Sequence, residues 1–214
     1  MTSFTTILQG HNSLQERKTT SLEKLEIIQG RFSGDPLLIG RDDICIFSAG
    51  SLGRLDSGTK SDLDIFVTAD GGEESKIGRL EEIELFSSIL RINRELEFPE
   101  LSNDGEYLKV FDIHESKSQI GSPADDNENW FTVRMLLLLE SRHLINPTAY
   151  TRHTKEILSV YFRDAEDHKP FKPLFLLNDI LRFWRTLCLN YEQARHTPSR
   201  AWKKKNFNLR FSEC

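Results

Sequence analysis

The chain has 214 residues, of which 38% are hydrophobic and 29% are charged, and its net charge is -5 at pH 7. This composition excludes collagen-like, low-complexity and strongly disordered proteins. A chain of this length buries enough apolar surface to fold without disulfide bonds. The acidic balance disfavours a general nucleic-acid coat but leaves room for one local basic site.

The cysteines and the apolar runs indicate the cellular compartment. Cys45, Cys188 and Cys214 lie far apart and lack CxxC spacing, so we expect a reducing environment and no structural zinc. The apolar runs are shorter than the ~20 residues that a membrane span requires. The N-terminal residues lack the basic and apolar regions of a signal peptide. We therefore expect a cytoplasmic protein with no membrane partner.

The first part of the chain combines helical and strand patterns. Apolar residues at helical spacing predict helices over 13–29 and 75–96. Short runs rich in β-branched and aromatic residues predict strands over 44–49, 62–69 and 107–113. Residues typical of turns separate these elements. The pattern favours a small mixed sheet with flanking helices.

The second part of the chain has a different pattern. The segments 130–145, 148–166 and 173–195 are each long enough for a helix, and prolines separate them. The predicted fold class is therefore α+β, with two units. The first, over 1–120, holds the sheet, and the second, over 121–214, is all-helical.

One stretch, CIFSAGSLGRLDSGTKSDLDIFV at 45–67, points to chemistry. A predicted strand runs into Gly50 and Ser51, where a small residue lets the backbone approach a phosphate. Asp62 and Asp64 are two apart on the next predicted strand, so both carboxylates project from one face. Carboxylate oxygens are the ligands that Mg²⁺ prefers. The ten residues between Ser51 and Asp62 allow a short helix and a return as the neighbouring strand, which brings the turn to the carboxylates.

This spacing resembles the nucleotidyltransferase superfamily of DNA polymerase beta, in which Gly-Ser is followed after about ten residues by Asp, an apolar residue and Asp or Glu. The residues that match are Ala49, Gly50, Ser51, Asp62, Leu63 and Asp64. A fuller pattern, which Gly53, Arg54 and Ser61 also match, is most similar to the branch that contains the bacterial uridylyltransferase of the PII protein and related nucleotidyltransferases. The segment FLLNDILRFWRTLCLNYE is similar to the helical segment that follows the catalytic domain in that branch.

The resemblance implies a set of site residues. Asp62 and Asp64 would hold Mg²⁺ or Mn²⁺, and the phosphates of a nucleoside triphosphate such as ATP would lie over Gly50 and Ser51. Arg54 and Ser61 would complete the nucleotide site, although Arg54 has the alternative of pairing with Asp56 or with the acidic residues of the loops. Lys60 is a weaker candidate for a phosphate contact.

The resemblance also implies a third carboxylate on the next strand, which would complete a two-metal site. Strand alternation places Asp112 with Leu108 and Val110, and a carboxylate on an apolar face is costly unless it is paired or metal-bound. We therefore select Asp112 as a catalytic residue and metal ligand. Glu106 and Glu115 remain alternatives.

The activity that the resemblance implies is transfer of a nucleoside monophosphate from a triphosphate to a protein or RNA acceptor, with release of pyrophosphate. Asp112 would help to deprotonate an acceptor hydroxyl. The alternative is a catalytically weak nucleotide-sensing or antitoxin-like regulatory module on the same fold. The residues do not identify the base, the acceptor or the oligomeric state, for which a homodimer is one option.

Two further segments each have two interpretations. The segment 200–210 interleaves basic residues with aromatic rings, which suits single-stranded nucleic acid or a solvated tail. Asp179, Arg182 and Arg185 share a helical face by their spacing. They would either line the cleft or form an internal ion pair.

Overall fold

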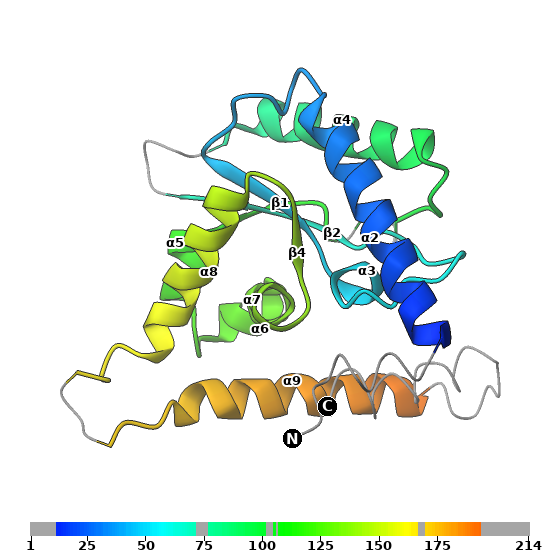
Figure 1. Ribbon diagram of the computed structural model, residues 1–214. Helices are drawn as coiled ribbons and strands as arrows, with labels where there is room; N and C mark the ends of the chain where they lie inside the picture. The colour runs from blue at the N-terminus through cyan, green and yellow to red at the C-terminus, as the bar shows by residue number, and fades with distance from the viewer. Residues whose placement is uncertain (1–11, 72–76, 102–104, 106, 167–169, 194–214) are drawn as a thin grey trace. The chain divides into compact units, whose positions relative to one another are not determined.

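The structure is a computed structural model that describes residues 12–71, 77–101, 105, 107–166 and 170–193 (Figure 1). The chain divides into two compact units, Met1–Ile157 and Leu158–Cys214. This division falls later in the chain than the boundary near residue 120 that the sequence predicts. In the described part of the chain, no helix combines the length and the apolar character needed to cross a membrane.

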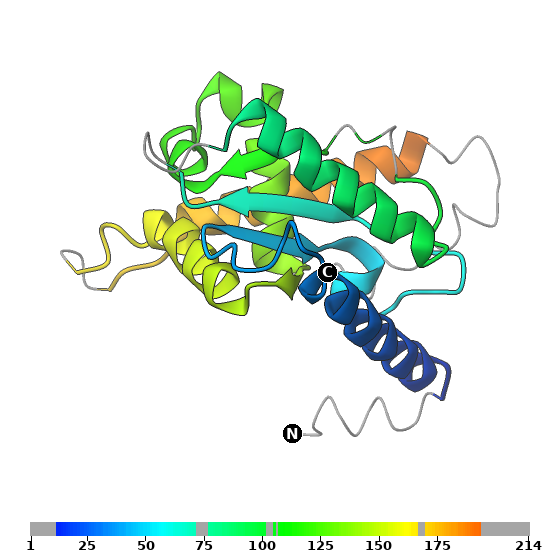
Figure 2. The same ribbon diagram turned by 90° about the horizontal axis from the view of Figure 1, so that it is seen from above.

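The described part of the first unit contains a four-stranded mixed sheet. Its strands are β1 (Ile44–Ser48), β2 (Ile65–Ala69), β3 (Val110–Asp112) and β4 (Arg142–Ile145). The strand order is β3-β2-β1-β4. Strand β1 is antiparallel to β2 and to β4, whereas β2 is parallel to β3. Seen from above, β1 and β2 lie side by side (Figure 2). The sheet and its helices confirm the mixed α+β class.

Helices cover both faces of the sheet in this unit. Figure 1 shows α2 (Asn12–Ser33) and α4 (Arg79–Glu95) on one face, and α7 (Trp130–Leu139) and α8 (Pro147–Tyr161) on the other. The helices α2 and α4 confirm the two that periodicity predicts over 13–29 and 75–96. The shorter helices are α3 (Gly50–Gly53), α5 (Ile113–Ser118) and α6 (Pro123–Asn127).

The main core lies between the sheet and the α2–α4 layer. Its fully buried residues include Ile28 of α2, Ile46 of β1 and Ile89 of α4. On the opposite face, Phe47 of β1 stacks on Phe66 of β2 with ring centroids 5.5 Å apart. Because both faces are covered, the strands read as continuous apolar runs rather than as an alternation of apolar and polar residues.

The predicted all-helical second half is corrected by the structure. The apolar run that begins at Trp130 is helical only as far as Leu139, and Arg142–Ile145 forms β4 beside β1. Strand β1 is buried along its whole length, so its backbone groups on the side away from β2 need hydrogen-bond partners. Strand β4 supplies them. This pairing joins residues about a hundred positions apart, which local periodicity does not register.

The described part of the second unit contains α9 (Leu174–Gln193), as the apolar spacing over 173–195 predicts. The Tyr161 hydroxyl donates a 2.7 Å hydrogen bond to a carboxylate oxygen of Asp179, which is buried. This bond assigns Asp179 an internal role. The basic segment over 200–210 lies outside the described residues.

Candidate functional site

The turn at the end of β1 brings the backbone against a carboxylate. Gly50 has φ +61, in the left-handed region that disfavours side chains. A Cβ atom on Gly50 would lie 2.2 Å from Oδ2 of Asp64. Glycine is therefore required here both for the backbone angle and for space. The predicted meeting of the Gly-Ser turn and the second aspartate is confirmed.

The two aspartates lie in the segment that leads into β2. The ladder between β1 and β2 ends at the pair Ser48 and Ile65, because β1 then turns into α3. The predicted strand over 62–69 therefore begins at Ile65 instead. One more backbone bond, from Ala49 N to Asp64 O at 3.0 Å, holds the segment beside the turn.

The carboxylate of Asp64 is electrostatically strained. Burial raises its pKa, the negative charges of Asp62 and Glu140 raise it further, and Arg54 partly opposes them, so that the pKa is about 6. Like charges near a buried carboxylate disfavour its ionised form. A bound divalent cation reverses this effect, because it favours the charged carboxylate. The strain thus fits a cation held by Asp62 and Asp64.

The junction between α7 and β4 forms the other wall of this turn. A Cβ on Gly53 would lie 2.0 Å from the Glu140 carbonyl oxygen, so the two backbones are in direct contact. The Arg142 Nε donates a 3.1 Å hydrogen bond to the Gly53 carbonyl. The sequence reasoning missed this junction because it predicts a helix across it. The polar residues Glu140 and Ser141 after a run of leucines were the signal that the helix ends.

Arg54 is paired within the protein. Its guanidinium forms an ion pair with Glu140 and lies 3.6 Å from a carboxylate oxygen of Asp56, and its side chain is only 15% exposed. The alternative of a pair with Asp56 is therefore the one that the structure shows. The Arg54–Glu140 pair ties α3 to the end of α7, and so fixes the wall beside Asp64.

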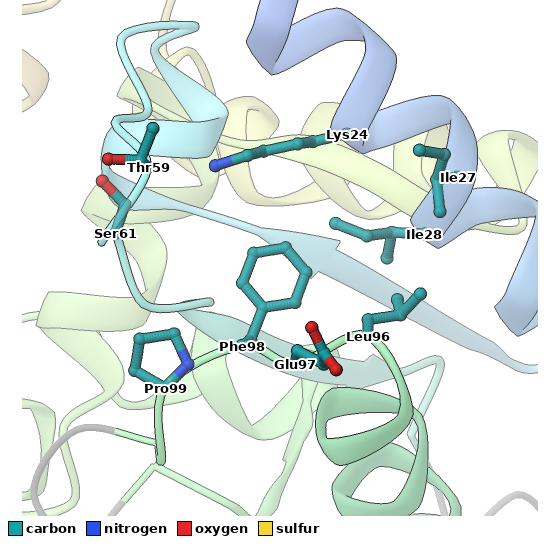
Figure 3. Close-up of a pocket in the computed structure, with 9 residues that line it drawn as sticks. All are labelled: Lys24, Ile27, Ile28, Thr59, Ser61, Leu96, Glu97, Phe98 and Pro99. Atoms are coloured by element: carbon teal, nitrogen blue, oxygen red, sulfur yellow. The ribbon is translucent and has the colours of Figure 1, made fainter.

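Ser61 lies in the loop that leads to Asp62. Its hydroxyl accepts a 2.9 Å hydrogen bond from the Gly58 amide. Its side chain lines a hollow of about 170 Å³. Figure 3 shows that Lys24 of α2 and Phe98, which follows α4, line the same hollow. The Lys24 ammonium donates a 2.7 Å hydrogen bond to the Gly58 carbonyl. Ser61 and Lys24 therefore shape the loop that leads to Asp62.

Asp112 does not join the two aspartates. It is in register with Ala69, which lies at the opposite end of β2 from Asp64. At the rise of a strand, the Cα atoms of Asp64 and Ala69 are about 16 Å apart. Its carboxylate accepts a 2.9 Å hydrogen bond from the Glu115 amide and caps α5. The predicted third metal ligand is thus wrong. The strand ends at this residue, and the helix cap supplies the partner that its charge needs.

The alternatives for a third carboxylate have separate outcomes. Glu115 lies in α5, beyond the same distant end of β2, and Glu106 lies outside the described residues. Within the described ranges, no group of three or more His, Cys, Asp or Glu side chains is arranged to hold a metal ion. The site contains a carboxylate pair.

A second polar cluster lies at the other end of β2. His153 bonds Thr68 Oγ1 through Nδ1 and Asp70 Oδ1 through Nε2, both at 2.8 Å. Arg152 also donates to both Asp70 oxygens at 2.6 Å. The chain of hydroxyl, imidazole and carboxylate resembles a hydrolase triad. However, His153 is 0% exposed and Thr68 is 1% exposed, so no substrate reaches them and the cluster instead fastens α8 to β2.

Comparisons with protein-family models, with curated proteins and with solved structures found no match for this chain. The function is therefore inferred from the chemistry of the two clusters on β2. Of these clusters, the pair Asp62 and Asp64 is the one that includes a close backbone turn, at Gly50, and a carboxylate with a raised pKa, that of Asp64.

Proposed function

We propose that this protein is a metal-dependent nucleotidyltransferase that moves a nucleoside monophosphate from a triphosphate to a protein or RNA acceptor and releases pyrophosphate. The observation that carries the proposal is the contact between the Gly50 backbone and the Asp64 carboxylate. This contact places Gly50, which has no side chain, against one of the two aspartates whose oxygens would bind the cation. Phosphate binding and cation binding therefore share one corner of the fold.

The carboxylate pair suits Mg²⁺ or Mn²⁺. Asp62 and Asp64 would hold the ion, which binds through one or two carboxylates and leaves its other positions to water and substrate phosphates. Such an ion neutralises charge on the phosphates. The raised pKa of Asp64 supports this role, since burial and the charge of Asp62 outweigh the effect of Arg54, and a bound cation would favour the charged carboxylate.

The remaining residues of the corner position the substrate. The turn of Gly50 and Ser51 lets phosphate oxygens approach the backbone, and the Arg54–Glu140 pair keeps that turn rigid. An acceptor hydroxyl then attacks the α-phosphorus in line with the departing pyrophosphate and loses its proton to solvent, the new P–O bond forming as the bond to the pyrophosphate oxygen breaks. Reactions of this kind depend chiefly on positioning and on charge neutralisation.

A nucleotide-sensing module on the same fold is the second candidate. One observation favours it: among the described residues, no group of three or more His, Cys, Asp or Glu side chains is arranged to hold a metal ion. A sensor would bind the triphosphate through the same turn and would not transfer it. The two functions differ in whether label from the α-phosphate becomes covalently attached to an acceptor.

The test uses the purified full chain with each of the four α-labelled triphosphates, Mg²⁺ or Mn²⁺, and cell extract. Label in protein and label in RNA are scored separately. We expect incorporation into one of them by the wild type and none by the double variant Asp62→Asn with Asp64→Asn. The control is Asp42→Asn, an exposed aspartate. Binding of the triphosphate without incorporation of label would support the sensor. If the protein neither binds the triphosphate nor incorporates label, both functions are excluded.

A further inference from the structure

We infer that Arg142 binds the phosphates of the triphosphate at the Gly50–Gly53 turn, an inference that rests on the proposed function. Arg142 takes the phosphate-binding role that the resemblance implies for Arg54, whose guanidinium is held by Asp56 and Glu140. Arg142 reaches the turn from β4, a strand that local sequence patterns did not predict.

The position of Arg142 follows from the sheet. Its backbone is in register with Ser48, the last residue of β1, so it lies beside the strand end from which the turn starts. Its Nε donates to the Gly53 carbonyl at 3.1 Å, which aims the guanidinium at the end of α3. One donor therefore fixes the side chain on the turn itself.

The other donors of Arg142 are available to a ligand. The residue is exposed, and no described residue accepts a hydrogen bond or forms an ion pair with its Nη1 or Nη2 group. A guanidinium presents its N–H groups in a planar fork that matches two oxygens of one phosphate. Because Nε is already hydrogen-bonded to the turn, the Arg142 side chain loses less conformational entropy when it binds a phosphate.

The charges around the turn call for such a cation. Asp62 and Glu140 both act electrostatically on Asp64, and Arg54 offsets only part of their effect. An incoming triphosphate adds more negative charge. On the α2 side, the cation Lys24 donates to a loop carbonyl. Arg142 supplies positive charge from the β4 side, with donors to spare.

The test measures binding of a fluorescent, non-hydrolysable triphosphate with Mg²⁺, which needs no turnover. The variant Arg142→Gln keeps a side-chain amide that can donate to the Gly53 carbonyl but lacks the charge and the fork. We expect its dissociation constant to rise at least about tenfold, with a weaker dependence on salt and an unchanged melting temperature. The matched control is Arg79→Gln, whose side chain is 77% exposed on α4; it should bind as the wild type does.

Two further measurements separate binding from structure. Methylguanidinium should restore part of the affinity of Arg142→Ala, a rescue that a purely structural defect would not show. If Arg142→Gln stays folded and binds as tightly as the wild type, the inference about Arg142 is wrong while the nucleotidyltransferase proposal stands. If Arg54→Gln loses affinity and Arg142→Gln does not, the site depends on Arg54 and the inference about Arg142 is wrong. If the wild type binds no triphosphate, both proposals fail.

Discussion

Strand β2 has an aspartate at each end, and the two are treated differently by their surroundings. Asp70 follows the strand, where hydrogen bonds from Arg152 and His153 outweigh the effect of burial and lower its pKa. Asp64 precedes the strand, where burial and then the charge of Asp62 raise its pKa to about 6. The protein therefore stabilises the charged form of Asp70 and disfavours the charged form of Asp64.

This difference in pKa distinguishes an aspartate with a structural role, Asp70, from one that we propose to bind a ligand, Asp64. Structural acids are paired because an unpaired buried charge is costly. Perturbed pKa values gather at functional sites, where a ligand completes the balance. Asp70 thus links β2 to α8, whereas the unfavourable state of Asp64 would be relieved by the cation and the triphosphate that we propose.

The largest expected effect is on activity. Replacing Asp64 by Asn should reduce nucleotidyl transfer by at least about a thousandfold, because the neutral amide binds the cation poorly and the phosphate charge is no longer offset. Replacing Asp70 by Asn should leave transfer unchanged at temperatures where the variant is folded. The measurement is label incorporation from the α-phosphate, with circular dichroism to confirm folding. Equal losses in both variants would remove the distinction between the two ends of β2.

A second expected effect concerns the turn that touches Asp64. Gly50→Ala should destabilise the protein by about 3 kcal/mol, since alanine is strained at φ +61 and its Cβ meets the carboxylate. In an Asp64→Ala background the carboxylate is gone, and the cost should fall to about 1 kcal/mol, the backbone term alone. Urea unfolding of the four proteins gives the coupling between the two sites. Additive costs would mean that Gly50 and Asp64 are not in contact.

A third expected effect lies at the opposite end of the strand. Asp70→Ala should destabilise the protein by about 2 kcal/mol, because it leaves His153 Nε2 without its carboxylate and removes the partner of Arg152. Asp42→Ala, at an exposed position, serves as the control and should change stability by less than about 0.5 kcal/mol. Urea unfolding at pH 7 measures both. A neutral Asp70→Ala would show that the cluster does not fasten α8.

The sequence predicts the corner around Gly50 because its parts are local. Only a short connection separates Gly50 from Asp64, so one strand, one turn and one return segment suffice to bring them together. The prediction fails at Asp112, where alternation along an assumed long strand indicates a face, but β3 ends at that residue and the carboxylate caps α5. Strand ends depend on neighbouring strands, which periodicity alone does not reveal.

The α7–β4 junction was missed for a related reason. The leucines after Trp130 favour a helix, and nothing local marks Arg142–Ile145 as the partner of a strand from the start of the chain. The ion pair between Arg54 and Glu140 depends on that partner too. The pairing of β4 with β1 therefore decides that Arg54 is paired with Glu140 and that Arg142 contacts the turn.

The smallest expected effect is the pH dependence of stability that Asp64 imposes. Its pKa in the folded protein, about 6, lies above its ordinary value of 3.8, so the folded state binds the proton more tightly than the unfolded state does. This stabilisation is complete below pH ~4 and is lost as pH rises through ~6. Without divalent cations, Asp64→Asn should therefore gain roughly 1 to 2 kcal/mol over the wild type between pH 4 and pH 8. Urea unfolding in EDTA across this range measures the gain; a flat difference would mean that Asp64 carries no strain, and Asp42→Asn should show no such trend.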